Sequence, residues 1–257
     1  MKSYGELDVI YKLDEVEKAV LNIAEEMSKE VQKIKYGSLY YKAKRVLNYS
    51  KIEISNAINK LYLKKYIVVG SRLTKDQILQ NQTRKRVYEY IVAHIGAHIR
   101  EIRDNLSITP HILNWHLNML ENFNYTFRIK FLKYVTFFPS TFDRTAAVPF
   151  LALKNENSFR IFKKCLENPL VDFESLRAGL NLQPNVIFYH LNNLIKFDVI
   201  FAHKINQTVV YGIKLEKITP IKTFYDLSDE EIENAIRLQN IMTEKSSTNK
   251  NNRIYLI

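Results

Sequence analysis

The residues of this sequence that could do chemistry include a dense group of lysines and arginines in one stretch. Residues 33–72 hold ten basic side chains against a single carboxylate, Glu53, which gives this stretch most of the chain's net charge of +11. Lys and Arg neutralise phosphates and so supply much of the affinity of proteins for duplex DNA. We therefore expect side chains of this stretch to contact the phosphate backbone of DNA. The alternative interpretation is a solvated basic face. The residues expected to contact DNA are Lys42, Lys44, Arg45, Lys51, Asn56, Asn59 and Lys60.

Two later segments of helical spacing, starting at Pro110 and Pro184, carry polar and aromatic residues opposite their leucines. Asn can pair with adenine in the major groove, and apolar groups can meet the methyl group of thymine. Neither segment has a Lys or Arg in its first three turns, so both are expected to read DNA weakly. The candidate contacts are His111, Asn114, Trp115 and Asn118 in the first segment and Asn185 and Tyr189 in the second.

Other bases form two smaller groups around residues 84–133. Arg84 and Lys85 belong to a basic cluster that opens a helix, whereas Arg128, Lys130 and Lys133 lie on a predicted hairpin. Bases on such a hairpin can touch the phosphate backbone or the minor groove. The alternation of these residues with Phe and Ile also fits a plain half-buried strand with a polar outer face.

An internal repeat organises the elements that must position these residues. Residues 83–139 align with residues 157–213 at a constant offset of 74, without a gap. The apolar positions coincide throughout, and Trp115-His116-Leu117 aligns with Tyr189-His190-Leu191. A repeat of this length sets the architecture before any local assignment. The shared position of His116 and His190 indicates a shared packing or hydrogen-bonding role, and satisfied structural histidines are favoured over metal ligands.

Each copy has the spacing of three helices followed by two strands. In the first copy we expect helices from about Val87, over 98–105 and over 109–122, then strands over 125–131 and 134–138. In the second copy we expect helices near 157–167, 172–179 and 184–196, then strands over 199–204 and 208–215. Asn206-Gln207 is expected to form the turn between these strands, because Asn tolerates the left-handed conformation.

A third, weaker copy precedes these two. Ser50 stands where Thr109 stands, which fits a helix N-cap, and residues 66–69 have the pattern of a strand. Its earlier helices are expected over 13–35 and 38–47, and its second strand is expected to be missing or shortened. The predicted domains are 1–72, 73–150, 151–225 and 226–257. The last of these holds an amphipathic helix over 228–243 and a polar tail from Lys245.

The stretches 73–81, 83–84, 98–102 and 109–117 resemble archaeal winged-helix regulators of the broad ArsR/MarR-like type, and Tyr189-His190-Leu191 echoes their third helix. The resemblance covers residues 73–139 well, 157–215 moderately and 36–72 poorly. It implies a mainly helical α+β fold with small hairpins, built as tandem winged-helix modules whose third helices enter the major groove. It also implies a transcription regulator, often a homodimer. Asn124 and Asp198 depart from the family, since they replace the glycine that commonly follows the third helix.

Several function classes are not expected. The six glycines are too scattered for a phosphate-binding or dinucleotide-binding loop. The single Cys165 excludes an internal disulfide and a cysteine-based metal site, and it is expected to be a small buried residue. Because no catalytic set can be singled out, we expect no enzyme activity, no cofactor and no metal. No apolar run reaches the roughly 18 residues of a spanning helix, so we expect a cytoplasmic, nucleoid-associated protein without a membrane span.

Two rival interpretations stay open beside double-stranded DNA binding. Exposed aromatics on base-poor third helices would suit a protein-interaction module without direct DNA readout, because large aromatics anchor protein interfaces. RNA binding shares the basic charge, although no aromatic RNA-binding platform is apparent.

Overall fold

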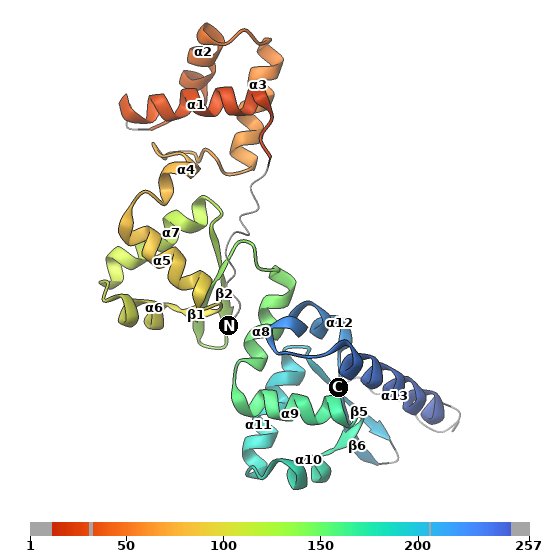
Figure 1. Cartoon of the computed structure of the whole chain (residues 1–257). Helices are drawn as coiled ribbons and strands as arrows, with labels where there is room; N and C mark the ends of the chain where they lie inside the picture. The colour runs from red at the N-terminus through yellow and green to blue at the C-terminus, as the bar shows by residue number, and fades with distance from the viewer. Residues whose placement is uncertain (1–11, 31–32, 206, 248–257) are drawn as a thin grey trace. The chain divides into compact units, whose positions relative to one another are not determined.

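The computed structural model describes residues 12–30, 33–205 and 207–247 (Figure 1). The chain is mainly helical, with two small antiparallel sheets of three strands each, which confirms the predicted α+β class. It divides into two compact units, Met1–Phe142 and Asp143–Ile257.

The first unit begins with three helices that pack on one another, α1 (Glu15–Glu30), α2 (Tyr36–Val46) and α3 (Lys51–Leu63). The apolar stripe of α1 is buried against α2 and α3, as its helical spacing predicts. The start of α3 is fixed by a capping box in which Ser50 accepts from the Glu53 amide and Glu53 accepts from the Ser50 amide.

The segment after α3 is not the strand predicted over 66–69. Only one isolated antiparallel bridge forms, between Ile67 and Thr74. Thr74 then caps α4 (Lys75–Ile78), which ends after a single turn, and Asn81 caps the next helix. The predicted absence of a full second strand is confirmed, because Thr74 already belongs to this helix start.

The second half of the first unit follows the predicted order. It contains α5 (Gln82–Ala93), β1 (Ala97–His98), α6 (Ile99–Leu106), α7 (Pro110–Asn122), β2 (Thr126–Phe131) and β3 (Tyr134–Pro139). The strands pair in the order β1-β3-β2, and the apolar faces of the helices and sheet enclose one core. In Figure 1 the β2–β3 hairpin follows directly from the end of α7.

The second unit repeats this order of elements. After η1 (Arg144–Ala146) and α8 (Ala147–Leu153) come α9 (Glu156–Glu167), β4 (Val171–Asp172), α10 (Phe173–Leu180), α11 (Pro184–Lys196), β5 (Ile200–Ile205) and β6 (Thr208–Ile213). The strands pair in the order β4-β6-β5, so β6 is the central strand of this sheet, as β3 is in the first sheet. Then follow α12 (Leu215–Ile218), η2 (Thr219–Phe224) and α13 (Asp229–Ser247), which Ser228 caps and which packs on α9.

The helices α3, α7 and α11 end in the same way. Each has thirteen residues, and the second residue past its end has a positive φ: 61° at Lys65, 57° at Asn124 and 63° at Asp198. The amide of the following residue donates to a carbonyl near the helix end, at 2.9 Å from Tyr66 to Leu61 and 2.8 Å from Tyr125 to Leu120. Asn and Asp tolerate this conformation without glycine.

The described residues include part of the predicted β-turn and part of the predicted tail. Gln207 carries the positive φ of the β5–β6 turn, 71°, whereas Asn206 lies outside the described residues. The polar tail expected from Lys245 is helical as far as Ser247, because α13 continues through it, and residues 248–257 lie outside the described part of the chain.

Candidate nucleic-acid interface

Helix α3 buries one side in the core of α1–α3 and leaves the other side open to solvent. Ile54, Ile58 and Leu61 are fully buried, while Asn56 and Asn59 are exposed on the opposite side. Ile52 lies on the same outward side and is 73% exposed. We call Ile52, Asn56 and Asn59 the α3 face.

The predicted bases at the start of α3 form a compact group. Lys44 and Arg45 end α2, and Lys51 opens α3 six residues later. All three are exposed, and none has an ion pair within the described residues. We call them the turn cluster. The partial positive charge of the α3 N-terminus adds to theirs, so this end of α3 favours an anion. Lys42 lies apart and reaches Glu30 at 3.8 Å.

Lys60 is engaged with α1 rather than left open. Its Nζ donates to Asp14 at 3.1 Å and lies 3.7 Å from Glu17, which is only 1% exposed. Lys64 bonds the same Glu17 at 2.7 Å. The hydrogen bond that Lys60 donates to Asp14 raises the pKa of Lys60, which favours its charged form. Lys60 was expected to contact phosphate, but in this fold its ammonium already pairs with the acidic start of α1.

Helix α7 presents the residues that the sequence assigns to its outer face. His111, Asn114 and Asn118 are exposed, and Trp115 is 50% exposed. Ile112 is also exposed on the first turn. Leu113, Leu117 and Leu120 are buried, so the predicted orientation of α7 is confirmed.

Arg84 lies beneath this face and not on the surface where the sequence predicted it. It is 2% exposed, its Nη1 donates to the Ile78 carbonyl at 2.8 Å, and its guanidinium lies 5.0 Å from the centre of the Trp115 ring. Burial lowers the pKa of Arg84. The guanidinium therefore cannot reach a phosphate while this packing holds, because α5 turns it inward.

His116, next to Trp115, is buried, and its Nδ1 has no hydrogen-bond partner among the described residues. Burial, and secondly the charge of Arg84, lower the pKa of His116. The prediction of a packed histidine is confirmed, but the prediction that it is satisfied is wrong at Nδ1.

The β2–β3 hairpin carries the remaining predicted bases of the first unit. Lys130 and Lys133 are exposed, and Lys133 lies 5.4 Å from the ring centre of Tyr134. Arg128 is held by Glu121, at 2.7 Å from its Nε, and also donates to Asn118. Lys85 lies 3.8 Å from Glu89. Lys130 and Lys133 are thus the bases of this hairpin that carry no ion pair among the described residues.

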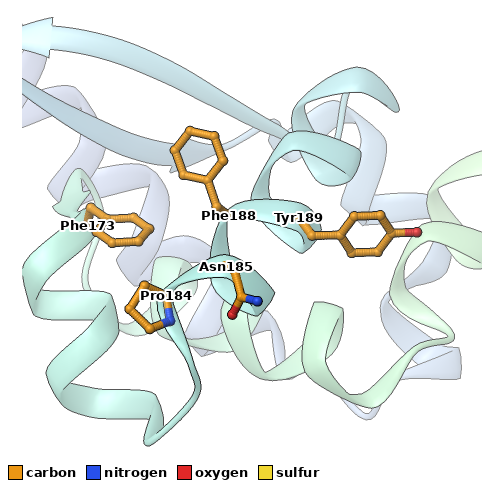
Figure 2. Close-up of a pocket in the computed structure, with 5 residues that line it drawn as sticks. All are labelled: Phe173, Pro184, Asn185, Phe188 and Tyr189. Atoms are coloured by element: carbon orange, nitrogen blue, oxygen red, sulfur yellow. The ribbon is translucent and has the colours of Figure 1, made fainter.

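Helix α11 exposes two aromatic side chains on its outer face. Phe188 and Tyr189 are 55% and 58% exposed, and with Phe173, Pro184 and Asn185 they line an open hollow of about 420 Å³. Figure 2 shows the rings of Phe188 and Tyr189 pointing in different directions, with Asn185 and Pro184 below them in the view. Beneath them His190 is buried and its Nδ1 lies 2.9 Å from Ser158 Oγ, which is the satisfied histidine that the sequence predicts.

The sequence assignment missed Ile52. The signal was present, because Ile52 aligns with His111 and Asn185 when Ser50 is placed on Thr109. The three outward faces therefore correspond position by position, with Asn59, Asn118 and Asn192 at one shared place.

Over residues 12–30, 33–205 and 207–247, no group of three or more His, Cys, Asp or Glu side chains could hold a metal ion. No helix in the described part of the chain has the length and apolar character needed to cross a membrane.

No protein-family model matches the chain. Over 141 residues, 55% of its length, the chain is 31% identical to an uncharacterized HTH-type transcriptional regulator of Methanocaldococcus jannaschii. The aligned part is 36% of that protein, so the chain spans about a third of the length of this relative. The chain is thus similar to an archaeal helix-turn-helix regulator over more than half of its residues, in agreement with the resemblance found from the sequence motifs.

Proposed function

We propose that the chain is a DNA-binding transcription regulator that holds duplex DNA with winged-helix modules. The observation that carries the proposal is the turn cluster: Lys44, Arg45 and Lys51 are exposed, without ion pairs among the described residues, and adjoin the polar α3 face. A third helix with bases at its N-terminal end can place its side chains in the major groove while the bases neutralise phosphates.

Three features support the modular part of this proposal. Helices α3, α7 and α11 have equal lengths and the same backbone ending. Residues 82–139 and 156–213 share one element order and one strand order. The relative in M. jannaschii is named as an HTH-type transcriptional regulator. We propose the modules as 1–72, 73–150 and 151–225, followed by a C-terminal helix in 226–257, with Lys130 and Lys133 as a second set of phosphate contacts.

A homodimer on two half-sites belongs to the same proposal, since helix-turn-helix dimers place two third helices about one duplex turn apart. Its test is sedimentation of the full chain with and without duplex. A nucleoid-associated location follows if the chain binds DNA.

The proposal is tested by a salt titration of binding to a mixed-sequence duplex. We expect the affinity of the wild-type chain to fall steeply with salt, and the slope of log K against log salt to be shallower by about 2–3 in the Lys44→Ala, Arg45→Ala, Lys51→Ala variant. The matched control removes three bases from the second unit, Lys163→Ala, Lys164→Ala and Lys196→Ala, and should keep most of the wild-type slope. Absence of binding by the wild type at about 50 mM salt would overturn the proposal.

A second candidate function is favoured by the hollow on α11. Phe173, Pro184, Phe188 and Tyr189 expose apolar surface where a DNA-reading helix would carry polar groups. Aromatic side chains of this kind anchor protein partners. Under this alternative the chain is an assembly subunit without direct DNA readout, and Phe188→Ala with Tyr189→Ala would abolish capture of a partner protein.

A further inference from the structure

The α3 face has a side-chain composition that selects among base pairs. Ile52, Asn56 and Asn59 are spaced i, i+4 and i+7, so they form one stripe along the helix. All three are exposed, and Ile52 is 73% exposed. Ile52 to Asn59 spans about 10 Å at a rise of ~1.5 Å per residue. This equals about three base-pair steps of a duplex, which rises ~3.4 Å along its axis per step.

Each member of the stripe can recognise one edge of an A·T pair. The carboxamides of Asn56 and Asn59 can donate to adenine N7 and accept from adenine N6, and the branched side chain of Ile52 can pack on the methyl group of thymine. The neighbouring Ser55 hydroxyl is engaged with the Tyr36 hydroxyl at 2.7 Å, so it does not compete for this role.

The stripe also lacks the groups that read G·C pairs. Arg or Lys is the usual partner of guanine, and Glu or Asp the usual partner of cytosine. Lys60 is bound to Asp14, and Glu53 is bound to the Ser50 amide at 2.8 Å in the capping box. Both side chains are therefore engaged within the first unit and lie off the stripe.

We infer that α3 selects a short A·T-rich core, in which Asn56 and Asn59 read adenines and Ile52 contacts a thymine methyl. The inference rests on the proposed function and names the DNA that the same site prefers. The turn cluster supplies phosphate contacts that do not depend on sequence, and the α3 face supplies the discrimination.

The test compares duplexes of equal length and flanks whose central six base pairs are all A·T or all G·C, at one salt concentration. We expect the wild-type chain to bind the A·T core about tenfold or more tightly. Replacing the core thymines with deoxyuridines removes only their methyl groups and should weaken wild-type binding about fourfold. The Ile52→Ala variant should bind the thymine core and the deoxyuridine core equally, because it lacks the side chain that contacts the methyl group. Replacing adenine with 7-deazaadenine should weaken the wild type and not the Asn56→Ala, Asn59→Ala variant.

Val69→Ala provides the matched control. Val69 is 84% exposed in the same unit but lies outside α3, so its loss should leave the response to deoxyuridine unchanged. Steep salt-dependent binding with less than a twofold preference for the A·T core would overturn the inference and leave the proposed function standing. The inference would also be overturned if the A·T preference were unchanged by the base analogues and by the α3 variants. The preference would then arise from the shape of the groove. Absence of binding to either duplex would overturn both proposals.

Discussion

Residues 82–139 of the first unit and 156–213 of the second share one backbone order but differ in their interior pairs. In the second unit Ser158 and His190 form a buried hydrogen bond, whereas the matching positions hold Arg84 and an unpartnered His116 Nδ1. Across each hairpin, Phe127 stacks on Phe138 at 5.3 Å, whereas Phe201 stands opposite Gly212.

The outer surfaces of the same two regions differ even more. The β2–β3 hairpin carries Arg128, Lys130 and Lys133, and the matching positions of the second unit are Ala202, Lys204 and Gln207. The comparison indicates that the spacing of buried apolar residues specifies this backbone, and that interior polar pairs and surface charges can change within it. Each difference between the two regions can be tested by substituting the residue that creates it.

The largest effect is expected from Gly212→Ala. A Cβ at Gly212 would overlap the Phe201 ring, so the ring has to move from its place across the hairpin. We expect the free energy of unfolding to fall by about 1–3 kcal/mol, measured by urea unfolding.

Gly179→Ala is the control for that substitution. A Cβ there meets only the flexible Lys164 side chain at 3.5 Å, and Gly179 lies in α10, so this variant should gain about 0.5–1 kcal/mol. Equal stability of the Gly212→Ala and wild-type chains would contradict the close approach of Phe201. The double variant with Phe201→Ala should recover part of the loss if the clash is its cause.

A somewhat smaller effect is expected from Ser158→Ala. The substitution leaves His190 Nδ1 buried without its partner, as His116 Nδ1 already is, and should cost about 1–2 kcal/mol in unfolding experiments. Ser175→Ala, at an exposed position of α10, should change stability by less than about 0.5 kcal/mol. If both serine variants unfold alike, the hydrogen bond to His190 does not stabilise the second unit.

The smallest effect concerns the pH dependence of stability. Burial lowers the pKa of His116 and of His190 below the ordinary value of 6.5, with Arg84 as a further cause at His116. The unfolded chain thus binds more protons, so these histidines stabilise the fold fully above pH 6.5, and this contribution is lost as pH falls through their folded pKa values.

Arg84→Met removes the nearby charge and should bring the pKa of His116 closer to 6.5. Urea unfolding between about pH 7.5 and pH 5 should then show a shallower loss of stability toward acid than in the wild type. The variant His190→Gln should reduce the slope independently of Arg84. A wild-type stability that is flat or rises toward acid would contradict the lowered pKa values.

The sequence predicted most of the elements because their signals are local. The Thr109-Pro110 and Pro184 starts and the apolar periodicity locate α7 and α11 within one residue or two. The fate of individual polar side chains was not predictable in this way. Lys60 pairs with Asp14, which is 46 residues away in the sequence, and Arg84 turns inward beneath Trp115. Such partners depend on tertiary packing, whereas Ile52 was predictable from the repeat, because it aligns with His111.

Cys165 gives the second unit a built-in reporter. Its side chain is fully buried in α9, and burial raises the pKa of the thiol to about 12. Alkylating reagents attack the thiolate, so they react with this chain only when its second unit opens. The first unit contains no cysteine. The rate of alkylation therefore reports the opening of the second unit, and opening of the first unit does not contribute to it.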